Sequence, residues 1–100
     1  MTGTDLLHLL ADKFAWMESQ RLRVGTLFMH QSDIDNLPPD QFDRTTHKEH
    51  LDLGIRGTLW GADVLISEHV YPGWVAIAPA GMKVQLVDDS ACMKLERTPL

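Results

Sequence analysis

The spacing of the apolar residues changes once along this chain, and the change limits the folds that it can adopt. From Leu6 to Leu22 apolar residues recur at steps of three and four, which is the spacing of one helix face. After Gly54 they come in short β-rich runs separated by glycine, proline and aspartate. The sequence therefore predicts an α+β fold with an amphipathic N-terminal helix, short helices and a small, mostly antiparallel sheet.

Length and composition favour one folded unit. The 100 residues predict a single domain over 1–100, and a domain of that size can bury a core without disulfides or metals. The apolar fraction of 44% and the charged fraction of 23% are typical of globular proteins. Cys92 is the only cysteine, which excludes an intrachain disulfide and fits a reducing compartment. Its place in a predicted strand favours a small buried thiol over a reactive one.

The charge argues against two classes of partner. Nine Lys and Arg against fourteen Asp and Glu give a net charge of −5, the wrong sign for a protein that neutralises phosphates. The basic residues are scattered, with only Arg21 and Arg23 close together. No apolar run has the length of a membrane span, and the N-terminus lacks the pattern of a secretory signal. We therefore expect no nucleic acid or membrane partner and a cytoplasmic location.

The first predicted elements are a helix and a strand. The helix covers 5–21, with Thr4 as its N-cap and Lys13 among the polar residues of its outer side. The run from Val24 to Met29 has the length of a buried strand.

A polar region is predicted to follow. Ser32 caps a helical turn over 33–37, which Pro38 ends because proline lacks an amide donor. Four aspartates and no basic residue between positions 33 and 43 indicate a solvated loop, and we expect 38–45 to be the most mobile part of the chain.

The rest of the chain is predicted to contain one more short helix and then strands. Thr46 caps the helix over 47–53, and Gly54 ends it in the left-handed conformation. In the last two strands apolar and polar residues alternate, so each is expected to bury one face only. The predicted strands are 55–60, 62–67, 74–78, 83–87 and 92–97.

His47 and His50 are the first candidates for chemistry, because two imidazoles on one short helix could bind a metal. Glu49 lies between them at the wrong spacing for the two-histidine metalloprotease helix. We expect no metal or other cofactor, and a metal-dependent enzyme on these histidines stays open as a third hypothesis.

Two further patterns fail on inspection. Asp33, Asp35 and Asn36 resemble the start of a calcium loop, but Pro38 and Arg44 occupy the positions that need glycine and glutamate. Ser67, Glu68 and His69 carry the side chains of a hydrolase triad, but neighbours on a strand point to opposite faces. We therefore expect no catalytic residues and no enzyme.

Three aromatic residues are the candidate functional surface. Trp60, Tyr71 and Trp74 lie close together in the sequence around the predicted central hairpin. Core packing is the first interpretation, because large aromatic side chains dominate small cores. A contact with another protein is the functional interpretation.

The segment around these aromatic residues resembles part of a known family. Residues 54–67 have the sequence GIRGTLWGADVLIS, and 69–73 have the sequence HVYPG before a last apolar strand over 74–78. This pattern, and the order of helix, strand and short helix before it, is similar to the axial domain of tailed-phage major capsid proteins and encapsulin-like shell proteins. The resemblance covers about 5–87.

The resemblance implies a structural role. A complete shell subunit also has an N-terminal arm, an extended loop and a peripheral domain, for which this chain has no room, so an axial-type domain alone is implied. Axial domains meet around symmetry axes, so the implied partners are other copies of the chain or other shell subunits, in the cytoplasm or in a virion or shell. The alternative is a small ligand- or peptide-binding module that uses the aromatic hairpin, for which a pocket lined by both Trp60 and Trp74 would be evidence.

Overall fold

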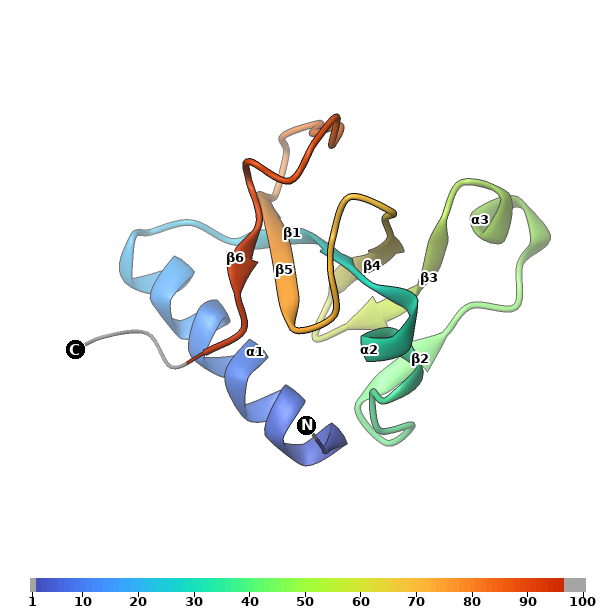
Figure 1. Ribbon diagram of the computed structural model, residues 1–100, viewed down its shortest axis with the longest axis horizontal. Helices are drawn as coiled ribbons and strands as arrows, with labels where there is room; N and C mark the ends of the chain where they lie inside the picture. Colours follow the sequence, from blue (N-terminus) through green and yellow to red (C-terminus); the bar gives the residue numbers. More distant parts are fainter. Residues whose placement is uncertain (1, 97–100) are drawn as a thin grey trace.

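The computed structural model describes residues 2–96, which form one six-stranded sheet and three helices (Figure 1). The strand order is β2-β3-β4-β1-β5-β6, in which β1 and β4 are parallel and the other four neighbouring pairs are antiparallel. The predicted α+β class with a mostly antiparallel sheet is confirmed. The elements are α1 (Gly3–Ser19), β1 (Val24–Met29), α2 (Gln31–Asp35), β2 (Phe42–Arg44), α3 (Lys48–Asp52), β3 (Ile55–Leu59), β4 (Ala62–Ile66), β5 (Trp74–Pro79) and β6 (Met93–Lys94).

Helix α1 begins earlier than the sequence pattern predicts. The Thr2 hydroxyl accepts a hydrogen bond from the Asp5 amide at 3.1 Å, and the Asp5 carboxylate accepts one from the Thr2 amide at 3.4 Å. This reciprocal capping box makes Thr2 the N-cap, so the prediction of Thr4 was wrong. Hydrogen bonding of the Asp5 carboxyl to the side chain and the backbone amide of Thr2 lowers its pKa.

The other end of α1 closes with a Schellman motif. The Leu22 amide donates to the Met17 carbonyl at 3.0 Å, and the Arg21 amide donates to the Glu18 carbonyl at 2.9 Å. Arg21 has a φ of 60°, in the left-handed position that glycine usually occupies. The chain leaves the helix there and enters β1, whose bounds match the predicted strand.

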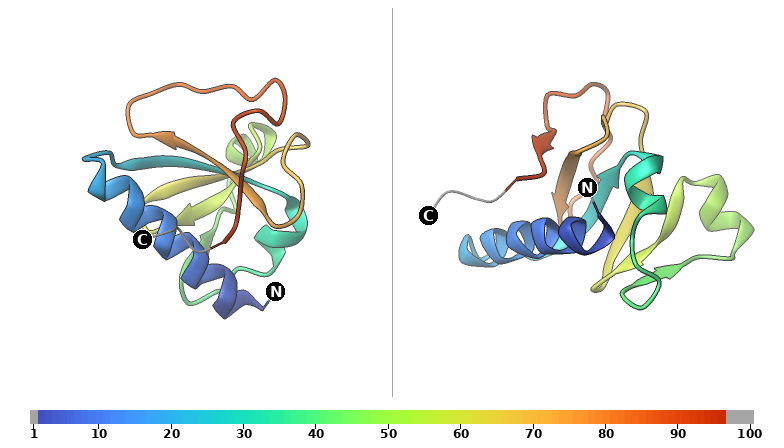
Figure 2. Two further views of the ribbon diagram at one scale, coloured as in Figure 1. Left: turned by 60° about the vertical axis from the view of Figure 1, so that its left-hand side comes forward. Right: turned by 60° about the horizontal axis from the view of Figure 1, so that its bottom comes forward.

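One face of the sheet is covered by α1, which runs across it (Figure 2). The buried residues of the helix are Leu6, Leu10, Lys13 and Met17, at steps of four, three and four. Lys13 therefore lies on the buried side of the helix. The prediction that it lies on the outer side was wrong. The main core cluster joins these helix positions to the sheet, and its sheet residues include Leu27, Met29, Leu59, Val64 and Val75.

The opposite face is covered by irregular chain. Phe28 of β1 packs there with Val70 and two alanines of β5, and Leu86 and Cys92 lie against this cluster. The strand predicted over 83–87 is wrong, because this segment has no regular structure and crosses the face as a loop. Alternation of apolar and polar residues does not by itself supply a strand partner, and the outer edge of β5 pairs with β6 instead.

The predicted solvated loop also differs from the structure. Phe42 is 2% exposed and pairs with Leu59, so part of 38–45 is the edge strand β2. Asp33 is buried, and α2 begins after His30, whose ring accepts a hydrogen bond from the Ser32 amide at 3.1 Å. Ser32 is therefore not the cap of this helix. A lone apolar residue in a polar run gives too little pattern to reveal a strand that its partner stabilises.

The remaining elements agree more closely with the predictions. Helix α3 begins one residue later than predicted, with His47 as its N-cap in place of Thr46, and Gly54 has a φ of 86° after it. Strands β3, β4 and β5 lie within a residue of their predicted bounds. The last predicted strand is reduced to Met93–Lys94, and Arg97 lies outside the described residues. Within residues 2–96, no helix is long and apolar enough to cross a membrane.

Candidate functional site

The segment from Tyr71 to Trp74 forms a tight turn between β4 and β5. The Trp74 amide donates to the Tyr71 carbonyl at 3.0 Å, and Gly73 has a φ of 83°. Pro72 and Gly73 therefore occupy the central positions that they favour in a type II turn. The segment that contains this turn passes the end of β1, because β4 and β5 lie on opposite sides of that strand.

Two distant segments hold this turn in place. The buried Asp33 carboxylate of α2 accepts a hydrogen bond from the Gly73 amide at 2.8 Å. The Gly73 carbonyl accepts another from the Leu95 amide, also at 2.8 Å. The amide that a type II turn leaves unpaired is thus satisfied by a residue forty positions earlier, and the turn is fixed from both sides.

The turn presents its two aromatic side chains to solvent. The exposed fraction is 63% for Tyr71 and 38% for Trp74. Trp60 is 42% exposed, but it lies at the start of β4, whereas Tyr71 and Trp74 follow its end. None of the three side chains belongs to the buried core, so the core-packing interpretation is wrong, and β4 separates Trp60 from the other two.

Trp60 belongs to a second turn, between β3 and β4. Leu59 pairs with Ala62, and the two residues between them have positive φ values, 50° for Trp60 and 85° for Gly61, which define a type I′ hairpin turn. The indole ring meets the Phe14 ring of α1 edge to face, with centroids 5.1 Å apart. The indole Nε1 donates to the Gln41 Oε1 at 3.0 Å, so this ring is held on two sides.

A hollow of about 360 Å³ lies beside Trp60, at the end of α1. Trp74 does not line it, so the two tryptophans do not share one pocket. The sequence pattern missed this site because only the fold brings the β3–β4 turn to α1. The one signal present was the pair of neighbouring arginines, Arg21 and Arg23. The lining residues are Phe14, Glu18, Arg21, Leu22, Arg23, Val24 and Trp60.

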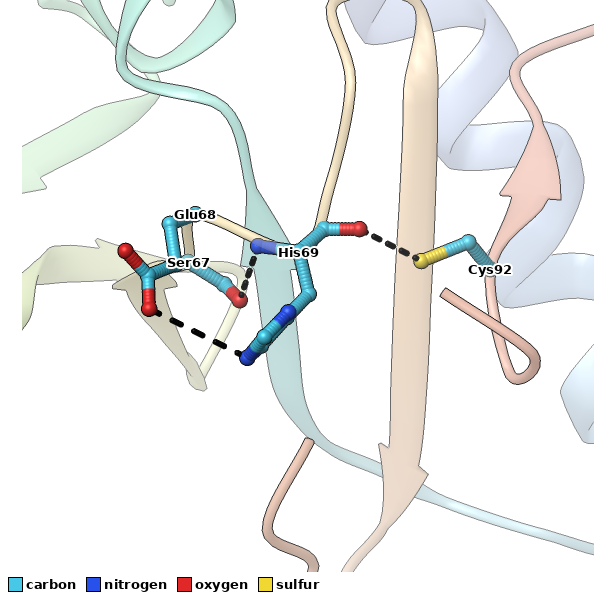
Figure 3. Close-up of polar contacts among 4 residues, drawn as sticks. All are labelled: Ser67, Glu68, His69 and Cys92. Atoms are coloured by element: carbon cyan, nitrogen blue, oxygen red, sulfur yellow. Dashed lines mark hydrogen bonds and ion pairs between the residues drawn. The ribbon is translucent and has the colours of Figure 1, made fainter. Parts of the chain in front are cut away.

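The possible triad residues lie in the turn after β4 and not on a strand (Figure 3). The Ser67 hydroxyl accepts a hydrogen bond from the backbone amide of His69 at 3.2 Å, so it serves the turn and does not meet the imidazole. The His69 Nε2 lies 4.0 Å from the Glu68 carboxylate, which is exposed. The three side chains therefore lack the serine–imidazole contact that a hydrolase triad needs.

Cys92 lies beside this group of residues. Its thiol donates to the His69 backbone carbonyl, with sulfur and oxygen 3.7 Å apart (Figure 3). Burial raises the pKa of the Cys92 thiol, and the Asp89 and Asp88 carboxylates raise it further. The protonated thiol is therefore favoured over the thiolate, which is the reactive form.

His47 and His50 lie close together at the start of helix α3. Their ring centroids are 5.3 Å apart, and the His50 Nδ1 is 3.2 Å from the Thr45 hydroxyl. Both histidines line a hollow of about 320 Å³ that also includes Asp43 and Asp63. Among residues 2–96, no group of three or more His, Cys, Asp or Glu side chains is placed to hold a metal ion.

The residues that resembled a calcium loop make hydrogen bonds within the protein. Asp33 holds the Gly73 amide, and the Asp35 carboxylate accepts from the Gln31 side chain at 2.6 Å. The Asn36 side chain donates to the Ser32 carbonyl at 3.1 Å.

No protein-family model, no curated protein and no solved structure matches this chain.

Proposed function

We propose that this chain is a virus- or prophage-derived structural domain, related to the axial domain of shell proteins, that acts through protein–protein contact. The contact surface is the Tyr71–Trp74 turn. The observation that carries the proposal is an exposed aromatic pair on a backbone that hydrogen bonds to Asp33 and Leu95 hold in place. The partners are other copies of the chain or other shell subunits.

A rigid aromatic pair suits a binding surface for an energetic reason. Tyrosine and tryptophan are enriched among the residues that dominate binding at protein interfaces. Association loses part of its free energy to the ordering of loops and side chains, and a turn that is already ordered loses less. Because the hydrogen bonds of this turn involve its backbone, both aromatic rings stay free for a partner.

The order of the elements supports the kinship with axial domains. The chain runs through α1, β1 and α2, then through β2 and α3, and then through the glycine-punctuated strands β3, β4 and β5. The resemblance implies the same helix, strand and short helix before these strands, but a loop where β2 and α3 lie. The segment 54–66 folds as paired extended strands, which the resemblance requires of this region. The rest of the support for the kinship is the sequence pattern over 54–78.

Self-association can be measured by light scattering coupled to size exclusion, over about 10 μM to 1 mM, the range of weak protein contacts. We expect the mean mass to rise with concentration. The double variant Tyr71→Ser/Trp74→Ser should stay monomeric and folded, with a lower melting temperature, because the Trp74 side chain is only 38% exposed and its buried part is lost.

The matched control is Leu53→Ser/Val87→Ser, which removes two exposed apolar side chains, 71% and 75% exposed, away from the turn. This control should associate as the unmodified chain does. A chain that is monomeric at every concentration, or an association that both double variants lose equally, would contradict the proposed surface.

A further inference from the structure

The hollow between the end of α1 and the β3–β4 turn combines apolar walls with charged side chains. Phe14, Val24 and Trp60 contribute apolar surface, and Glu18, Arg21 and Arg23 contribute charge. Its volume of about 360 Å³ falls in the range of small-molecule sites, about 300–1,000 Å³. A second hollow of about 320 Å³ shares Phe14, Glu18 and Trp60 with it, so the two adjoin.

The aromatic wall of this hollow is fixed before any ligand arrives. The rings of Phe14 and Trp60 meet at an interplanar angle of 87°, and Gln41 holds the indole nitrogen. A flat ring in the hollow can therefore meet aromatic surface without first ordering it. Contacts between aromatic rings in such offset or edge-on arrangements are favourable beyond the area that they bury.

The two guanidinium groups beside this wall are available for an anion. Within residues 2–96, neither the Arg21 nor the Arg23 side chain has an ion pair or a hydrogen bond. A guanidinium group presents parallel N–H donors that match the two oxygens of a carboxylate. In a chain with a net charge of −5, two neighbouring unpaired arginines favour a negatively charged ligand at this place.

The backbone gives a second, independent indication. Among the described residues, Arg21 and Trp60 are the only residues other than glycine with positive φ, at 60° and 50°. Both line this hollow. Glycine or asparagine would adopt these conformations with less strain, and strained residues cluster at functional sites. The two residues with this backbone conformation thus both carry side chains that line the hollow.

We propose that this hollow binds a small planar aromatic carboxylate. The ring packs against Phe14 and Trp60, and the carboxylate lies between Arg21 and Arg23. Glu18, in the same hollow, repels the anion and limits its affinity. This site lies at the other end of β4 from the Tyr71–Trp74 turn, so it does not depend on the proposed protein contact.

The test is an NMR titration of the ¹⁵N-labelled full chain with naphthalene-2-carboxylate. The reporter is the Trp60 indole N–H signal, assigned by its loss in Trp60→Phe, and the Trp74 indole is the internal reference. We expect saturable shifts of the Trp60 signal with a Kd on the order of 1 mM, as for a fragment-sized ligand. Naphthalen-2-ylmethanol, which lacks the charge, and acetate, which lacks the ring, should both bind at least about fivefold more weakly.

Three charge variants test the geometry. Arg21→Gln and Arg23→Gln should each raise the Kd about fivefold, because each removes one guanidinium group from the carboxylate. Glu18→Gln should lower the Kd about twofold, since it removes the repulsion. The control Lys48→Gln removes a positive charge on α3, outside the hollow, and should leave the Kd unchanged.

Three results would each overturn the proposal. The first is equal affinity for the carboxylate and the neutral alcohol, and the second is a Kd that Arg21→Gln and Arg23→Gln leave unchanged. The third is the absence of saturable shifts at the Trp60 indole in a spectrum that shows the chain to be folded. Neither result bears on self-association through the Tyr71–Trp74 turn, which light scattering measures separately.

Discussion

The two turns at opposite ends of β4 both expose aromatic side chains, but they are held by different interactions. The type II turn at Tyr71–Trp74 is fixed through its backbone, by Asp33 and Leu95. The type I′ turn at Trp60 is fixed through its side chain, by the Phe14 ring and by Gln41. In the first turn a glycine takes the positive φ, and in the second a tryptophan takes one of the two positive φ values.

This difference separates the roles of the aromatic residues. The hydrogen bonds that hold the first turn join its backbone to Asp33 and Leu95 and do not involve the side chains of Tyr71 and Trp74. Trp60 is part of the packing that joins the β3–β4 hairpin to α1, and its ring also lines the hollow. Substitutions of Tyr71 or Trp74 change the exposed surface of the first turn, whereas a substitution of Trp60 changes both the packing against α1 and the lining of the hollow.

The largest expected effect comes from Gly57→Ala, which breaks the hairpin that carries Trp60. A Cβ atom at this position would meet the Asp43 carbonyl oxygen and lie 2.7 Å from the Phe42 ring. We expect the free energy of unfolding to fall by about 3 kcal/mol or more, because the clash adds to a backbone that favours glycine. Urea unfolding followed by circular dichroism measures it.

The control for this prediction is Thr58→Ala, on the same strand at an exposed position. It should change the free energy of unfolding by less than about 0.5 kcal/mol. Equal stability of the Gly57 variant and the control would show that β2 does not approach β3 as closely as described.

The next effect tests the other turn. Asp33→Ala leaves the Gly73 amide without its buried acceptor, which should cost about 1–3 kcal/mol of unfolding free energy. The Gly73 amide should also exchange with deuterium faster, because its hydrogen bond is lost. Hydrogen exchange followed by NMR measures both quantities.

Asp35→Ala is the matched control, because Asp35 is exposed and, within the described residues, its carboxylate accepts a hydrogen bond only from the side chain of Gln31. It should cost no more than about 0.5 kcal/mol. If the exchange rate of the Gly73 amide stayed the same in the Asp33 variant, the turn would be held by other contacts.

The smallest expected effect concerns the strain beside the hollow. Arg21→Gly puts glycine into the left-handed position that ends α1, which should stabilise the chain by about 0.5–1 kcal/mol. The same change removes one guanidinium group, so naphthalene-2-carboxylate should bind more weakly. Thermal unfolding and the NMR titration measure the two effects, and a loss of stability would mean that the Arg21 side chain has a structural role.

Strong local patterns made most of the fold predictable. The apolar spacing of α1 and the apolar run of β1 identify these elements, and the glycine-punctuated runs identify β3, β4 and β5. Pro72 and Gly73 predict a turn, and the structure has one of the type that they favour. Each of these signals comes from a few neighbouring residues whose own conformational preferences point to one structure.

Two segments were predicted incorrectly, because their local sequence does not show what pairs with them or packs against them. β2 is three residues long and depends on pairing with β3, so its polar sequence gave no strand signal. The segment 83–87 alternates as a strand does, but it covers the second face of the sheet as a loop. Alternation shows that one side of a segment is apolar and does not show what lies against it.

The fold class, the helix, most of the strands and the turn at Pro72–Gly73 follow from the sequence alone, because local preference and periodicity act between near neighbours. The burial of Asp33 against Gly73 and the packing of Trp60 on Phe14 beside two arginines depend on how the elements are arranged in space. These contacts join residues about forty positions apart. Their free energy depends on strand order and on helix placement, which no short stretch of sequence encodes.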